Sequence, residues 1–222
     1  MDMTRREFLA CTAAAAMPLD LRLPSSPTAP TRLRCLVLPV PGECSLPESV
    51  EGYRSFHAGL GDPRTGLVAH VVIVPAVLHL SPHLIGTIVK FVRNGMTVIV
   101  ESGAGFAGHS KFRQHRRSLR EGLELDVQAP VALWTDDSKS RRIPYVDYTW
   151  PCSTKIRDFS RVVPVGDQPG EIIAWVDGMP VALKRQVGAG TLIFLGSPLG
   201  PALWAGDAEA RRWLMASLPL LH

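Results

Sequence analysis

Two patterns of apolar residues alternate in the middle of the chain. Residues 69–75 (AHVVIVP) and 96–101 (MTVIVE) are short, nearly uniform apolar runs, typical of strands covered on both faces of a sheet. Between them the apolar residues recur at the spacing of one helix face, behind a Ser-Pro start at 81–82 and ahead of an Asn-Gly stop at 94–95. This strand, helix and strand predict a right-handed crossover and a parallel sheet.

The pattern extends in both directions from this unit. Towards the N-terminus we expect a strand in 34–40 and a helix in 47–59, with proline in its first turn. After the unit, the sequence predicts a basic helix, a further strand, and an insertion of loops and short strands, at 111–120, 123–127 and 130–147.

The C-terminal third is again regular. Residues 171–176 and 180–186 flank an Asp-Gly pair, which predicts a β-hairpin. A Gly-rich turn leads into a buried strand at 191–195, and Asp207 is placed to cap a last helix over 208–218. The pattern therefore predicts an α/β domain with a largely parallel sheet, flanking helices, a C-terminal hairpin and a final helix.

The first residues resemble a targeting segment, and we do not expect them to belong to the folded domain. Residues 4–9 (TRREFL) resemble a twin-arginine export signal, and the alanine-rich run behind them is too short to span a bilayer. An ordinary helix that contains Arg-Arg and a lipid anchor on Cys11 are the alternatives, although cleavage after Ala14 or Ala16 fits a small-residue site better. We expect a signal at 1–17, a Pro/Ser-rich tether at 18–31, a domain at 32–222, and a periplasmic or otherwise exported protein.

Composition limits the classes of partner. The formal net charge is +4, and the charges of the predicted signal and tether cancel, so the domain is mildly basic. This balance is compatible with anionic envelope polymers and is far from that of a nucleic-acid-binding domain. Cys35, Cys44 and Cys152 remain in the domain, and a Cys35–Cys44 disulfide and a plain buried thiol at Cys35 are both open.

Two stretches carry a resemblance to a known family. Residues 91–105 (FVRNGMTVIVESGAG) and 180–199 (PVALKRQVGAGTLIFLGSPL) resemble the strand, sharp turn and terminal hairpin of the class I glutamine amidotransferase-like fold. Catalytic members have a cysteine in that turn and a His-x-Glu near the last strand. This chain has Glu101-Ser102-Gly103 and Gly196-Ser197-Pro198 there, so the resemblance implies no glutaminase activity.

The strand-end turn holds the strongest candidate for catalysis. Ser102 could act as a nucleophile there, with backbone N–H groups of Gly103 and Ala104 as oxyanion donors; alternatively its hydroxyl caps the next segment. His109 is near in sequence, but nothing identifies it as the base. Glu101 could be a general acid or base, or the partner of an arginine from 111–120.

Other candidates are weaker. Tyr145 and Trp150 could stack on a sugar, although inward packing is the commoner role of such aromatic residues. Asp136-Asp137 and His79/His83 give no convincing metal spacing, and the Gly-x-Gly at 103–105 lacks the rest of a dinucleotide fingerprint. The sequence therefore predicts no metal and no cofactor.

These observations lead to two hypotheses about function. The first is an exported, non-catalytic binding or assembly module with an amidotransferase-like fold, which binds an unknown envelope protein or glycan near Glu101 and Ser102. The alternative is an exported serine hydrolase that uses Ser102. Neither involves nucleic acid or a transmembrane span after signal removal, and the sequence does not set the oligomeric state.

Overall fold

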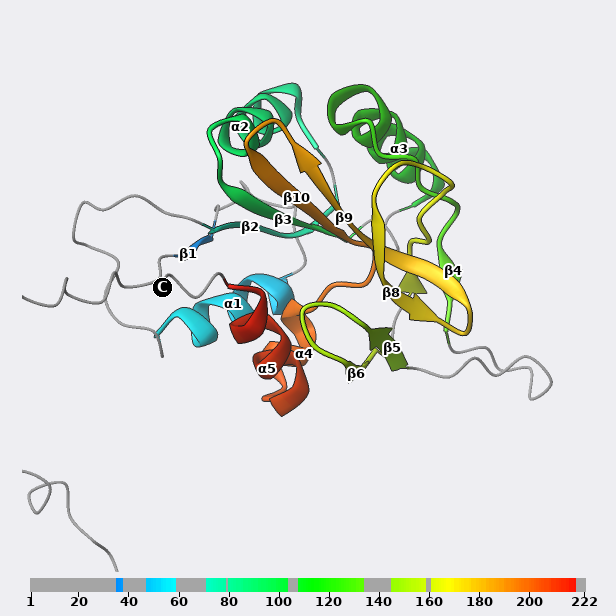
Figure 1. The fold of residues 1–222 in the computed structure, drawn as a ribbon. Helices are drawn as coiled ribbons and strands as arrows, with labels where there is room; N and C mark the ends of the chain where they lie inside the picture. The colour runs from blue at the N-terminus through cyan, green and yellow to red at the C-terminus, as the bar shows by residue number, and fades with distance from the viewer. Residues whose placement is uncertain are drawn as a thin grey trace, which may run out of the picture. The chain divides into compact units, whose positions relative to one another are not determined.

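A mixed eight-stranded sheet forms the centre of the structure (Figure 1). The computed structural model describes residues 35–37, 47–58, 71–78, 80–103, 108–133, 145–158 and 161–218, all within one compact unit, 32–222. In chain order the elements are β1 (Cys35–Val37), α1 (Pro47–Ala58), β2 (Val71–Val77), α2 (Pro82–Arg93), β3 (Thr97–Ser102), α3 (His109–Leu123), β4 (Val131–Ala132), β5 (Tyr145–Tyr148), β6 (Thr154–Arg157), β7 (Arg161–Val162), β8 (Glu171–Val176), β9 (Met179–Val187), β10 (Gly190–Leu195), α4 (Gly200–Trp204) and α5 (Ala208–Ser217).

The strand order β1-β2-β3-β10-β9-β8-β5-β6 divides the sheet into two halves. Strands β1, β2, β3 and β10 are parallel, whereas β9, β8, β5 and β6 follow one another antiparallel. The α/β class is confirmed. The predicted largely parallel sheet is wrong for the second half, because the hairpin β8–β9 and the strands beyond it extend the sheet through antiparallel pairs.

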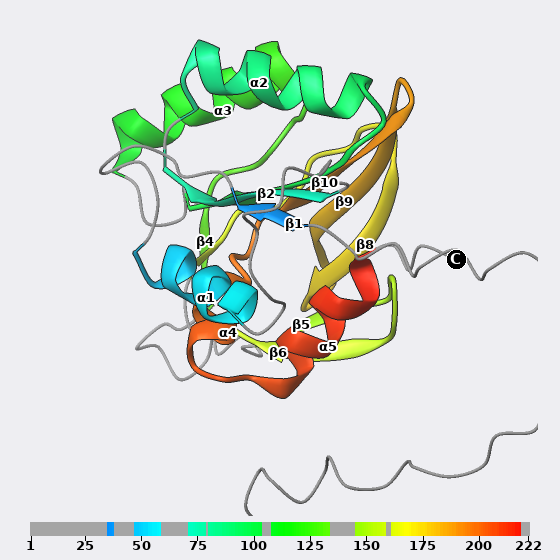
Figure 2. The same ribbon diagram turned by 90° about the vertical axis from the view of Figure 1, so that its left-hand side faces the viewer.

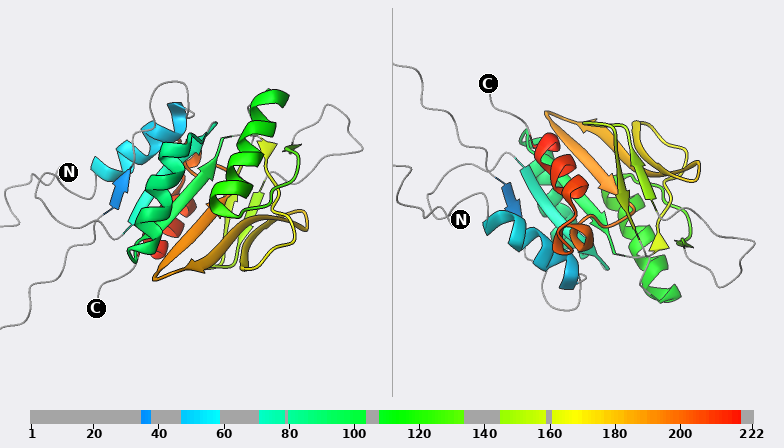
Figure 3. Two further views of the ribbon diagram at one scale, coloured as in Figure 1. Left: turned by 90° about the horizontal axis from the view of Figure 1, so that it is seen from above. Right: turned by 90° about the horizontal axis from the view of Figure 1, so that it is seen from below.

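Helices cover both faces of the sheet. Figure 2 shows α2 and α3 on one side and α1, α4 and α5 on the other, and the two views of Figure 3 show each set across its own face. Side chains alternate accordingly along β2 and β3. Val71, Ile73 and Ile99 join the core beneath α5, whereas Val72 and Val98 join the core beneath α2.

The crossover unit forms as its pattern predicts. Ser81 caps α2 by accepting a hydrogen bond from the Leu84 N–H at 3.2 Å, and Pro82 opens the helix. β2 and β3 then pair in parallel from Val71–Thr97 onwards. The hairpin, the last strand and the last helix are confirmed as well, and Asp207 caps α5 through the N–H groups of Glu209 and Ala210.

Some expectations about the middle of the chain are wrong. No strand forms at 123–127; α3 runs to Leu123, and Val127 makes only an isolated bridge to Val165. The short strands β6 and β7 and the helix α4 were not predicted, because four, two and five residues are too few to display a period.

Several predictions fall on residues outside the described ranges. These are the export signal, the tether, Cys44, His79, Ala104 and the Asp136-Asp137 pair. They stay predictions. Within the described part, none of the helices combines the length and the apolar character that a membrane span requires.

Candidate functional site

Glu101 lies at the end of β3, fully buried, and its carboxylate accepts four hydrogen bonds. Oε2 accepts from the Ser49 hydroxyl at 2.7 Å and the Ala76 N–H at 3.1 Å. Oε1 accepts from the Leu199 N–H at 2.8 Å and from the Tyr53 hydroxyl. One side chain thereby joins α1, β2, β3 and the segment before α4. The expected pairing of Glu101 with an arginine from residues 111–120 is wrong.

Two opposing effects act on the pKa of Glu101. Burial raises the pKa above its ordinary value of 4.5, because the charged form loses its hydration. The four hydrogen bonds act in the lowering direction and offset part of this effect, and the net direction is upward. A neighbouring phenol responds to the same environment: burial and the carboxylates of Glu101 and Asp158 raise the pKa of Tyr148.

The backbone beside Glu101 is irregular. Ala76 has φ 29°, and the pairing of β2 with β3 shifts between Val74 and Val77. A non-glycine residue with positive φ persists only where its surroundings hold it. The Glu101 carboxylate holds this bulge through the Ala76 N–H. A Cβ on Gly103 would come within 2.2 Å of the Ala76 carbonyl oxygen, so only glycine fits there.

Ser102 and His115 meet on the opposite face of the sheet from the Glu101 carboxylate, because successive side chains of a strand point to opposite faces and α3 lies across the sheet from α1. The Ser102 Oγ lies 3.1 Å from the His115 Nε2, and both side chains are buried. This distance is the one required between a nucleophile and its base. The histidine comes from the first half of α3 and is not His109, the one that is near in sequence.

The environment of the pair is closed. Ser102 is 1% exposed and His115 is fully buried. The Gly103 N–H, one of the two predicted oxyanion donors, donates to the Val77 carbonyl at 2.9 Å and is therefore engaged in the sheet. In this conformation the Ser102–His115 bond ties α3 to the sheet, and a catalytic role of Ser102 stays a prediction.

A helical period in the sequence would have identified His115. Phe112, His115, Leu119 and Leu123 are the buried residues of α3, and their spacing of three and four residues is that of a single helix face. A histidine on such a stripe points into the core, where its ring nitrogen needs a polar partner. The arginines of the same segment point elsewhere: Arg116 and Arg120 pair with Asp126.

We expect the Ser102–His115 bond to contribute to stability. Ser102→Ala and His115→Ala each remove one partner, and a double-mutant cycle should give a coupling free energy of about 1 kcal/mol. Urea unfolding of the two single variants and the double variant measures it. Additive effects would mean that the bond contributes nothing to the folded state.

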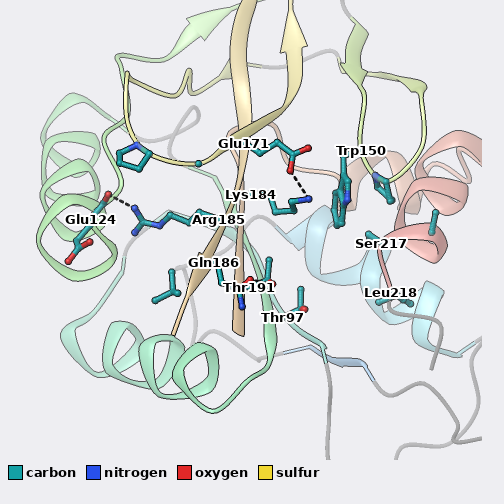
Figure 4. A pocket seen from close by; sticks show the side chains of 15 residues that line it. Thr97, Glu124, Trp150, Glu171, Lys184, Arg185, Gln186, Thr191, Ser217 and Leu218 are labelled. Atoms are coloured by element: carbon teal, nitrogen blue, oxygen red, sulfur yellow. Dashed lines mark hydrogen bonds and ion pairs between the residues drawn. The ribbon is translucent and has the colours of Figure 1, made fainter. Parts of the chain in front are cut away.

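A pocket of about 1010 Å³ lies at the N-terminal ends of the parallel strands β3 and β10, whereas Glu101 and Ser102 stand at the C-terminal end of β3 (Figure 4). It is bordered by the first residues of β3 and β10, by β8 and β9, by the segment after β5, and by the ends of α3 and α5. Neither Glu101 nor Ser102 lines it. Its lining includes Trp150, Glu171, Lys184, Arg185, Gln186 and Thr191.

Charged and aromatic side chains meet in this pocket. The Lys184 ammonium lies 4.4 Å from the centroid of the Trp150 ring and 2.7 Å from the Glu171 carboxylate. Lower in Figure 4, the Thr191 hydroxyl donates to the Gln186 side-chain carbonyl at 3.2 Å. Half-buried Trp150 is anchored from behind, since the Trp213 indole N–H donates to its backbone carbonyl at 2.8 Å.

The two predicted aromatic ligand contacts do not lie in the same place. Trp150 lines it, whereas Tyr145 lies on β5 outside the lining and is 38% exposed. Lys184 and Glu171 were not singled out from the sequence, because they sit on a hairpin whose pattern indicates only structure. Among the described residues, no group of three or more His, Cys, Asp or Glu side chains is arranged to hold a metal ion.

No protein-family model and no curated protein matches this sequence. Solved structures do resemble the fold. An exo-β-1,4-mannosidase from Opitutaceae bacterium strain TAV5 aligns with 86% of this chain and 36% of its own, at 12% identity and a TM-score of 0.57. A β-galactosidase from Bacillus circulans sp. alkalophilus aligns with 86% of this chain and 32% of its own, at 15% identity and a TM-score of 0.49. The chain thus spans about a third of each.

The first similarity is high enough to indicate a shared fold, and it corrects the sequence interpretation. The structure that shares the fold is an exo-β-1,4-mannosidase and not a glutamine amidotransferase, so the predicted amidotransferase resemblance is overturned. The expected non-catalytic module is overturned with it, because the protein that shares the fold is named as an enzyme, a mannosidase.

Proposed function

We propose that this chain is part of a glycoside-processing protein and that the pocket around Trp150 binds a sugar unit of the substrate. The observation that carries this proposal is the composition of the pocket: an indole ring beside an ammonium and a carboxylate, with an amide and a hydroxyl elsewhere in the lining. Its volume of about 1010 Å³ is at the upper end for small-molecule sites.

The chemistry of a sugar matches these groups. A pyranose ring has apolar C–H faces and a rim of hydroxyls, each a donor and an acceptor. The Trp150 ring supplies an apolar wall, whereas Glu171 accepts hydrogen bonds, Lys184 donates them, and Gln186 does both. The pocket is therefore lined by the two kinds of surface that a sugar presents.

The similar structures guide the choice of ligand. The mannosidase and the β-galactosidase are named for the sugars they release, so β-1,4-linked manno-oligosaccharides and galactosides are the first probes. Isothermal titration calorimetry of the chain with each should give saturable binding, with a Kd in the millimolar range or tighter. The natural full-length protein should release sugar from a glycan that binds.

Two results would contradict the proposal. If no oligosaccharide of the panel binds, the pocket is not a sugar site. If sugars bind but the full-length protein releases no product from them, the glycoside-processing part of the proposal fails.

A further inference from the structure

We infer that the pocket accepts an uncharged sugar unit and excludes acidic sugars such as uronic acids. This inference rests on the proposed function and specifies its substrate class. It follows from the formal charges of the residues that line the pocket and from the contacts that each cation there already makes.

Both cations of the pocket have partners within its wall. Lys184 is held between Glu171, at 2.7 Å, and the Trp150 ring. The Arg185 guanidinium donates to the backbone carbonyl of Glu124 at 3.1 Å (Figure 4). It also donates to the carbonyl of Leu123, the last residue of α3. An incoming carboxylate would have to compete with these partners for either cation.

Formal charges around the pocket cancel. The lining contains Lys184 and Arg185 as cations and Glu124 and Glu171 as acids, so it offers no net positive charge. Acidic ligands are recognised by cations in excess, most often by an arginine free to form a bidentate pair. Here the arginine is committed to the end of a helix.

Helix ends add to the barrier against anions. The C-terminal ends of α3, at Glu124, and of α5, at Ser217 and Leu218, both border the pocket. The C-terminus of a helix carries a partial negative charge. Arg185 already caps the end of α3 and Lys184 pairs with Glu171, so the end of α5 is what remains to repel a uronate, whereas an uncharged hydroxyl can donate to it.

A matched pair of ligands tests the inference. Calorimetry would compare β-1,4-mannobiose with the corresponding disaccharide of mannuronic acid, which differs by its carboxylates, at low salt. We expect the neutral sugar to bind at least about tenfold more tightly. Glu171→Gln removes one negative charge and frees Lys184, so it should raise the affinity for the mannuronate at least about fivefold.

The control is Glu121→Gln, which removes the same charge from an exposed position of α3 outside the pocket lining and should leave both affinities unchanged. Equal or tighter binding of the mannuronate by the unmodified protein would overturn the inference and leave the sugar site standing. An unchanged mannuronate affinity in Glu171→Gln would overturn the role of the Glu171–Lys184 pair. Failure of both ligands to bind, together with the rest of the neutral panel, would overturn the proposed function itself.

Discussion

Replacing Glu101 with alanine is expected to lower the free energy of unfolding by about 3–5 kcal/mol. The substitution leaves a cavity and deprives four donors of their acceptor: the hydroxyls of Ser49 and Tyr53 and the N–H groups of Ala76 and Leu199. It also releases the bulge at Ala76. For a domain of this size the midpoint of thermal unfolding should fall by at least about 6 °C.

Equilibrium unfolding in urea, followed by circular dichroism, measures this loss. Glu121→Ala is the matched control, because its exposed carboxylate pairs only with Arg117 at 3.9 Å across one helix turn. Such surface pairs contribute less than about 1 kcal/mol. A loss in Glu101→Ala no larger than that in Glu121→Ala would contradict the structural role of the buried carboxylate.

The raised pKa of Glu101 gives the same experiment a pH dependence. Because folding raises this pKa, the folded state binds the proton more tightly than the unfolded state does. The resulting stabilisation is complete below the ordinary value of 4.5 and is lost as the pH rises through the folded pKa. Glu101→Gln does not titrate at this position, so the stability of the unmodified protein relative to this variant should fall as the pH rises above 4.5.

Replacing Trp150 with alanine is expected to weaken sugar binding by at least about tenfold. The substitution removes the apolar wall of the pocket and the surface on which the Lys184 ammonium rests. Titration calorimetry with the tightest-binding oligosaccharide measures the change. Gln186→Ala, an exposed position of the same pocket, is a milder second variant with little effect expected on the fold, and it should weaken binding in the same direction.

Two aromatic positions serve as controls for Trp150. Trp204 is 59% exposed at the end of α4, and Tyr145 is 38% exposed on β5, and neither lines the pocket. Trp204→Ala and Tyr145→Ala should bind the sugar as the unmodified protein does. If either weakens binding as strongly as Trp150→Ala, the ligand sits elsewhere.

The elements near the crossover could be predicted because their signals are local. The uniform apolar run of β2 and the Ser81 cap of α2 each lie within one short window of sequence. The antiparallel half of the sheet was harder. The pairing of β5 with β8 joins Tyr148 to Ala174 across a segment that contains β6 and β7, and no local period indicates which strands become neighbours in the sheet.

The buried site was predictable only in part. Glu101 and Ser102 stand at a strand end, which the sequence identifies, but Ser49 and Leu199 approach Glu101 from 52 and 98 residues away. Trp150 was predicted as an aromatic ligand contact. Its neighbour Lys184 lies on β9, far along the chain, so no local pattern connects the two residues. Tertiary packing, and not any motif, assembles both places.

The most direct test of the sugar site is a titration followed by the indole N–H resonances of the tryptophans in a proton–nitrogen NMR spectrum. On addition of β-1,4-mannobiose, or of the tightest-binding sugar from the panel, the Trp150 resonance should shift in a saturable manner, while that of exposed Trp204 stays in place. A Trp150 resonance unmoved at saturating sugar would contradict the assignment of this pocket.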